Sequence, residues 1–305
     1  MHISVLRLPF VAVVSISLLS GMAAGQQTQT EEVHSTENLQ KATQNPVASM
    51  ISVPFQNNSN FGIGPYGRIQ NILNIQPVIP VKLTPDVNMI IRWVAPIVYQ
   101  PAPGTANLQV YGINEDTPAY FAAVDLQQHA AVGGFGDMAP TFFFTSSKPH
   151  KLIVGAGPML ILPTATSKVL GQGKFSMGPS ILALVQPGHW TLGGLVSNAW
   201  SVAGDSSRGD VNQMSLQYFI NYNLKKGWSL STGPIISANW NGSSGNVWTV
   251  PFGGGVGRVT RIGFQPANIG VQFYGNAVHP TGGSPWSMRL SVSLLFPKMP
   301  KPAAK

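Results

Sequence analysis

Residues 214–240 alternate apolar and polar side chains through two successive segments, which a Lys225-Lys226-Gly227 turn joins. A period of two residues is that of a β-strand whose two faces meet different surroundings. Every second residue belongs to the apolar face: Met214, Leu216, Tyr218, Ile220, Tyr222 and Leu224, then Trp228, Leu230, Thr232, Pro234, Ile236, Ala238 and Trp240. The tryptophans that begin and end the second segment favour lipid as the surroundings of this face.

Comparable segments recur from about residue 50 to residue 296. We expect twelve strands, near 50–57, 71–82, 88–99, 134–145, 151–162, 174–186, 190–202, 211–224, 228–240, 246–259, 266–278 and 285–296. Their connections alternate between short turns and longer loops, as in outer-membrane barrels, and loop 58–70 is counted among the long ones. Unpaired backbone groups cost several kcal/mol each in hydrocarbon, so such a sheet has to close on itself.

The sequence therefore predicts an all-β fold, an antiparallel transmembrane β-barrel of about 12 strands. A soluble β-sandwich also alternates and stays open as an alternative. The low content of charged residues, 9%, favours the barrel, because soluble domains have roughly 25%. The chain has no cysteine, which excludes disulfides and thiolate metal sites. The net charge of +8 is thinly spread, so we expect no nucleic-acid partner.

The N-terminus has the pattern of a signal peptide: Arg7, an apolar stretch over 8–19, and small residues up to Gly25. We assign 1–25 to a cleaved signal peptide, with a membrane anchor as the alternative. Residues 26–49 form a polar leader with a short helix near 36–43, either solvated or folded into the barrel as a plug. The barrel then covers 50–297, and 298–305 is a C-terminal tail. This organisation predicts the outer membrane of a Gram-negative bacterium, with the lipid bilayer and the barrel-assembly machinery as partners.

Several prolines fall inside the expected strands, where each removes a hydrogen-bond donor from the ladder. Three of them follow a glycine, at Gly157-Pro158, Gly178-Pro179 and Gly233-Pro234. We expect a bulge or bend at each pair, with a lateral break in the wall as the open alternative.

The candidate functional residues lie on the polar face of the strands, which would line the lumen. They are Arg92, Arg289, Asn74, Gln76, Gln217, Asn221, Asn239, Gln272 and Asn276. A charge within a membrane-spanning segment is a functional candidate, so the two arginines are expected either to bias ion selectivity or to pair with Asp137 or the leader. The expected membrane-interface aromatic residues are Trp93, Trp228, Trp240, Trp286 and Phe296.

Enzyme motifs are absent: GQGKF at 171–175 lacks the P-loop pattern, and neither HExxH nor GxSxG occurs. The histidines are scattered, so we expect no metal site and no cofactor. Outer-membrane barrels can act as hydrolases through a serine–histidine pair, and the residues to consider are His129, His279 and Ser284. We expect no enzyme, and keep a barrel hydrolase as an alternative.

Several long stretches resemble the family named for the MetA-pathway of phenol degradation, often labelled simply "transporter" and sometimes mislabelled neuromedin U. They are NPVASMISVPFQNNSNFGIGPYGRIQNILNIQPVIPV, GAGPMLILPTAT, LGQGKFSMGPS, DVNQMSLQYFINYNLKKGWSLSTGPIISANW, WTVPFGGGVGRV and LSVSLLFPK. The resemblance covers roughly 45–298 and implies an outer-membrane barrel linked to uptake of aromatic or other hydrophobic compounds. We therefore expect a passive channel for small hydrophobic or aromatic solutes, with a closed structural or surface-binding barrel as the alternative.

Overall fold

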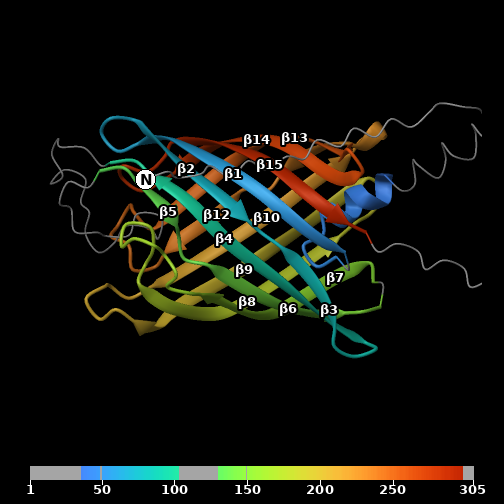
Figure 1. Cartoon of the computed structure of the whole chain (residues 1–305), viewed down its shortest axis with the longest axis horizontal. Helices are drawn as coiled ribbons and strands as arrows, with labels where there is room; N and C mark the ends of the chain where they lie inside the picture. The colour runs from blue at the N-terminus through green and yellow to red at the C-terminus, as the bar shows by residue number, and fades with distance from the viewer. Residues whose placement is uncertain (1–35, 49, 103–129, 149, 298–305) are drawn as a thin grey trace, which may run out of the picture.

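The protein is described here by a computed structural model, which covers residues 36–48, 50–102, 130–148 and 150–297. These residues form one closed antiparallel barrel, because the first strand pairs with the last from Ile51 opposite Phe296 to Phe61 opposite Trp286 (Figure 1). The assigned signal peptide and the C-terminal tail lie outside the described residues.

Fifteen strands and one short 3-10 helix make up the barrel wall and its turns. They are β1 (Ile51–Ile63), β2 (Arg68–Ile75), β3 (Val78–Lys82), β4 (Val87–Gln100), β5 (Val132–Phe135), β6 (Ala139–Ser146), β7 (Leu152–Ile161), β8 (Lys174–Val185), β9 (Trp190–Gly204), β10 (Asn212–Asn223), η1 (Lys225–Gly227), β11 (Trp228–Thr232), β12 (Ile235–Asn239), β13 (Trp248–Ile262), β14 (Gln265–Val278) and β15 (Trp286–Phe296). We call one passage of the chain from one end of the barrel to the other a crossing. Three crossings each consist of two strands, namely β2 with β3, β5 with β6 and β11 with β12. The wall therefore has twelve crossings, which confirms the expected barrel.

The prediction of a long loop over 58–70 was wrong. β1 continues to Ile63 and β2 begins at Arg68, so only four residues connect them. The polar run Asn58 to Asn60 suggested a loop, but polar side chains are stable in this wall where they find hydrogen-bond partners on a neighbouring strand. The Asn60 side-chain amide, for example, donates to Oε1 of Gln70 on β2 at 2.8 Å.

The three Gly-Pro pairs behave differently from one another. Pro158 on β7 and Pro179 on β8 lie opposite each other in an unbroken ladder, so the expected bulges are absent from this pair of strands. Each proline instead interrupts the pairing of its strand with the strand on its other side. The β6–β7 ladder skips residues next to Pro158, and the β8–β9 ladder skips residues next to Pro179. Only Gly233-Pro234 ends a strand, between β11 and β12.

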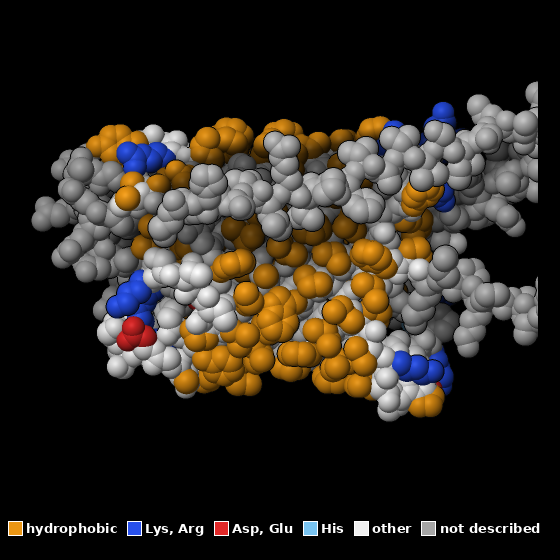
Figure 2. Space-filling model, in the orientation of Figure 1, with side chains coloured by type: hydrophobic (Ala, Val, Ile, Leu, Met, Phe, Trp, Pro, Cys, Tyr) orange, Lys and Arg blue, Asp and Glu red, His pale blue; other side chains and the backbone are white. Residues whose placement is uncertain are grey.

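The outer face of the barrel is an apolar belt, with Lys and Arg side chains gathered at its two ends (Figure 2). Leu152, Ile181 and Phe273 are examples from β7, β8 and β14, each more than half exposed. An apolar face this large is stable only against lipid or another apolar surface. Among the described residues no helix is long and apolar enough to span a membrane.

The leader segment, residues 36–48, lies at the barrel end that carries the short turns, where Figure 1 shows its helix over 36–43. The Gln40 amide donates to the carbonyl of Trp228 at 2.9 Å, and the Gln186 amide donates to the carbonyl of Lys41 at 2.8 Å. Gln44 and Asn223 exchange two side-chain hydrogen bonds. Of the two expectations for the leader, this favours the plug over the solvated segment.

Candidate functional site

All nine expected lumen residues lie on the inner face of the wall, as the strand register shows. Gln272 lies opposite Arg289, and Asn221 lies opposite Ser231, while their strand neighbours Phe273, Leu290 and Ile220 are exposed on the outside. The other lumen residues occupy the same face of their strands. The register agrees with the facing expected from sequence alternation, and the role of these side chains stays a prediction.

Arg92 belongs to a chain of side-chain hydrogen bonds that begins on β4. Its Nη2 donates to Oε1 of Gln76 at 2.6 Å, and Nε2 of Gln76 donates to Oε1 of Gln56 on β1 at 2.9 Å. Gln76 is almost completely buried. Within the ladder, Arg92 lies between Val78 of β3 and Thr141 of β6.

Arg289 projects from β15 and binds a backbone group of the segment between β11 and β12, beyond β13 and β14 in the sheet. Its Nε donates to Oδ1 of Asn58 at 2.9 Å, and its Nη1 donates to the carbonyl oxygen of Gly233 at 2.9 Å. The guanidinium also lies 5.0 Å from the ring centre of Tyr274, a cation–π distance. The Tyr274 hydroxyl accepts the N–H of Gly233 at 3.2 Å. Both backbone groups of Gly233 are thus bound by lumen side chains.

The alternative in which the lumen arginines pair with Asp137 is wrong. Asp137 lies between β5 and β6 and accepts the backbone N–H groups of Ala165 and Gln172, at 3.1 and 2.6 Å. Its carboxylate therefore fixes the loop between β7 and β8. The ion pairs among the described residues are Lys41–Glu37, Lys148–Asp86 and Lys174–Asp210.

The wall is interrupted beside Gly233-Pro234. β13 pairs with β11 from Trp228 to Ser231, and with β12 only at Ser237 and Ala238. Residues 232–236, all of them described, therefore make no ladder pairs with β13. On the other side of the gap, β13 has a register shift between Val250 and Pro251. We call this interruption the wall break.

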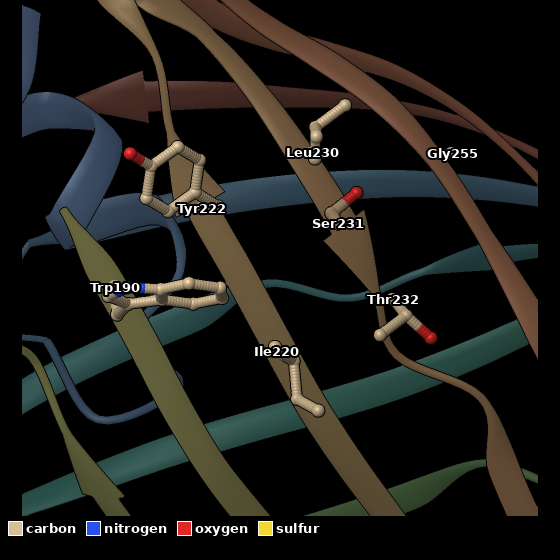
Figure 3. A pocket seen from close by; sticks show the side chains of 7 residues that line it. All are labelled: Trp190, Ile220, Tyr222, Leu230, Ser231, Thr232 and Gly255. Carbon is tan, nitrogen blue, oxygen red and sulfur yellow. The ribbon is translucent and has the colours of Figure 1, made fainter.

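An apolar groove of about 450 Å³ lies on the outer face next to the wall break (Figure 3). Trp190, Tyr222 and Leu230 are the large side chains of its lining, and Ile220, Ser231, Thr232 and Gly255 complete it. The rings of Trp190 and Tyr222 pack with centroids 4.7 Å apart. Thr232, the last residue of β11, belongs both to the groove and to the wall break.

The inner face also carries a buried apolar cluster, which the sequence analysis missed. It contains Val47 of the leader segment together with Val78, Ile90, Phe143, Leu182, Leu184, Leu195 and Phe219 of the wall. The signal was present in 181–185, where apolar residues continue without alternation. Such a run indicates that both faces of the strand meet apolar surroundings, here the outer belt at Ile181 and the buried cluster at Leu182 and Leu184.

The aromatic residues form two groups, near the two ends of the strands. Trp228 and Trp286 begin their strands, Phe296 ends β15, and Trp240 directly follows β12; all four are exposed outward. Trp93 differs, because it lies midway along β4 rather than at an end. Trp190, Trp200 and Trp248 also belong to these groups. Trp240 explains the outward Asn198 of β9, whose Oδ1 accepts the indole N–H at 2.8 Å.

Of the residues considered for hydrolysis, Ser284 and His279 make no hydrogen bond to each other. His129 lies outside the described residues. The Ser284 hydroxyl is within 2.6 Å of the carbonyls of Phe61 and Trp286, and Nδ1 of His279 lies 3.0 Å from the carbonyl of Pro280. A serine–histidine contact does occur in an exposed turn, between Oγ of Ser146 and Nε2 of His150 at 3.1 Å.

Comparison with known proteins supports the fold at the level of structure. No family model matches the chain, and no curated protein matches it in sequence. The COG4313 outer membrane channel from Pseudomonas putida F1 is similar with a TM-score of 0.58 and 13% identity, over 81% of this chain and 94% of that chain.

Two other solved structures are more distant. The CymD monoaromatic hydrocarbon channel has a TM-score of 0.42 and 9% identity, over 91% of this chain and 94% of that chain. Outer membrane phospholipase A from Escherichia coli has a TM-score of 0.40 and 11% identity, over 81% of this chain and 97% of that chain.

Proposed function

We propose that the protein is an outer-membrane channel of a Gram-negative bacterium that passes small hydrophobic or aromatic solutes by passive diffusion. The observation that carries the proposal is the contrast between the outer and the inner face of one closed barrel wall. The outer face is an apolar belt. The inner face carries two regions side by side: a polar zone of hydrogen-bonded side chains, formed by Gln56, Asn58, Gln76, Arg92 and Arg289, and the buried apolar cluster. Ligand sites for apolar molecules commonly combine such surfaces. The shared fold with a protein named as an outer membrane channel agrees with this function.

The resemblance to the MetA-pathway family supports the same solute class. Its sequence stretches include the two regions that build the polar zone, NPVASMISVPFQNNSN with Gln56 and Asn58, and LSTGPIISANW with Gly233. We infer that the chain is a member of that family and that aromatic compounds are among its solutes.

A solute could leave the lumen through the barrel mouth at the short-turn end or sideways through the wall break. Val47 is buried in the apolar cluster and Gln40 is almost completely buried, so the leader segment obstructs the short-turn mouth. The wall break offers an exit towards lipid, since residues 232–236 lack ladder bonds to β13 and the outer groove adjoins them. An apolar solute leaving this way would pass from the lumen into the membrane without crossing water.

A disulfide across the wall break tests this route in a chain that has no cysteine of its own. A Cβ added at Gly254 would lie 3.3 Å from Cβ of Thr232, close to the Cβ–Cβ spacing of a disulfide. The matched control joins the same two crossings where their ladder is intact, at Ser229 opposite Gly257. The readout is the initial uptake of N-phenylnaphthylamine, an aromatic probe that fluoresces in lipid, by host cells with intact outer membranes.

We expect expression of the protein to raise the uptake rate and oxidised T232C/G254C to lower it, with recovery on reduction. Oxidised S229C/G257C should behave like the wild type. Unchanged uptake in oxidised T232C/G254C would reject the exit through the wall and leave the channel function standing. If expression of the well-folded protein does not raise uptake at all, the closed structural barrel is the better description, and the plugged mouth favours that second candidate.

A further inference from the structure

The two lumen arginines converge on neighbouring residues of one strand. Arg92 reaches Gln56 through Gln76, and Arg289 reaches Asn58 directly. Gln56 and Asn58 are successive inward residues of β1, so the two guanidinium groups approach the same part of the inner wall from β4 and from β15. Both guanidinium groups therefore contribute positive charge beside this stretch of β1.

The hydrogen-bond partner of Arg92 is a neutral amide. The charge of Arg92 is held by Gln76, and no carboxylate among the described residues lies within ion-pair distance of it. A charged group inside a protein is costly unless an opposite charge compensates it. An anion bound beside Arg92 would supply this compensation.

Buried apolar side chains adjoin the charge. Val78 lies directly opposite Arg92 in the ladder, and Ile90, two residues along the same strand, lies opposite Phe143. All three apolar side chains belong to the buried apolar cluster. Arg92 is therefore at the margin between the polar zone and this cluster.

We propose that the lumen holds a binding site for solutes that carry an acidic group on an apolar body, such as aromatic carboxylates. The solute carboxylate would bind the guanidinium of Arg92, whose planar donors match both oxygens of a carboxylate. The apolar body would lie at the margin of the cluster beside Val78, the one of these three side chains that keeps some exposure, 7%. This proposal rests on the proposed channel function and names the solute class within it.

The test compares benzoate with benzyl alcohol, which has the same ring and no charge. Binding of each to the detergent-solubilised full-length protein is measured by calorimetry at low salt. We expect benzoate to bind at least about tenfold more tightly, the factor that one charge-assisted hydrogen bond supplies. R92Q should lose this preference, because glutamine keeps a hydrogen bond to Gln76 and removes the charge.

The matched control is R258Q. Arg258 faces outward with its guanidinium 5.2 Å from the ring centre of Trp228, so its replacement should leave the benzoate preference intact. Equal binding of the two solutes by the wild type, or a preference that survives in R92Q, would overturn the proposal. Uptake of the neutral probe N-phenylnaphthylamine by wild-type cells reports independently on the channel function, so the two failures are distinguishable.

Discussion

Nη1 of Arg289 lies 2.9 Å from the carbonyl oxygen of Gly233, although β13 and β14 separate their strands in the sheet. The contact crosses the lumen and ends at the one Gly-Pro pair that interrupts a strand. Pro234 has no N–H to give to the ladder, and the polar groups of Gly233 turn inward to Arg289 and Tyr274. The wall break is therefore tied to the polar zone by a charged hydrogen bond.

Replacing Arg289 should loosen this tie. In R289M, Oδ1 of Asn58 loses its charged donor, whereas the Gly233 carbonyl keeps the Gln217 side-chain amide at 3.3 Å. An unsatisfied buried acceptor costs about 1–3 kcal/mol. We expect a lower unfolding temperature in detergent, measured by the loss of heat-modifiable gel mobility. R289K, which keeps the charge and one donor group, should fall between R289M and the wild type. An unchanged transition in R289M would show that the contact contributes nothing to stability.

Arg92 should bias the permeation of small ions. Removing its charge in R92A lowers the positive potential in the lumen, so the reversal potential in a KCl gradient should shift towards cation selectivity. R258A is the matched control, since Arg258 lies on the outer face. Unchanged selectivity at a similar single-channel conductance in planar bilayers would eliminate this role of Arg92.

Phe143 and Phe144 are adjacent residues of β6 with opposite surroundings. Phe143 is fully buried in the apolar cluster, whereas Phe144 is 45% exposed on the outer face. Phe143→Ala leaves a cavity and should lower the free energy of unfolding by about 3–5 kcal/mol. Phe144→Ala should cost clearly less, because lipid can fill the vacated space. Equal losses in denaturant titrations of the two variants would contradict the assignment of the inner and outer faces.

The leader segment can be crosslinked to the wall at Gln44 and Asn223, whose side chains exchange hydrogen bonds of 2.7 and 3.2 Å. Two amides in such contact hold their Cβ atoms farther apart than a disulfide spans, so Q44C/N223C is joined with a short bifunctional maleimide. If solutes leave through the wall break, crosslinked Q44C/N223C should take up N-phenylnaphthylamine as fast as the same variant without crosslinker. A rate that falls on crosslinking would instead mean that the leader has to move and that the solute leaves through the short-turn mouth.

Trp93 should report on the middle of the wall. It lies midway along β4, whereas Trp228 begins β11. In variants that retain one of these tryptophans, lipids brominated deep in their acyl chains should quench Trp93 fluorescence more strongly than that of Trp228. The opposite order would return Trp93 to the membrane interface, where the sequence analysis placed it.

The fold and the facing of most side chains could be predicted because alternation is a local property. A residue such as Leu216 or Gln217 shows by its polarity which surroundings it meets, whatever its neighbours in space are. The same logic identified Arg92 and Arg289 as lumen residues. It failed at Asn58 to Asn60, where hydrogen bonds with other strands stabilise polar residues within β1. The depth of Trp93 stays a prediction, because an aromatic residue on the outer face can lie at any depth.

The sequence by itself determined the closed sheet, its two faces and the polar character of the lumen, since each depends on the period of side-chain polarity along single strands. The tertiary structure decided which Gly-Pro pair interrupts the wall, which apolar residues meet inside it, and what the arginines contact. Pro158 and Pro179 face each other across an intact ladder, whereas Gly233 meets Arg289 and Tyr274 across the lumen. These outcomes depend on the register between strands and on closure of the barrel, which bring together residues far apart in the chain.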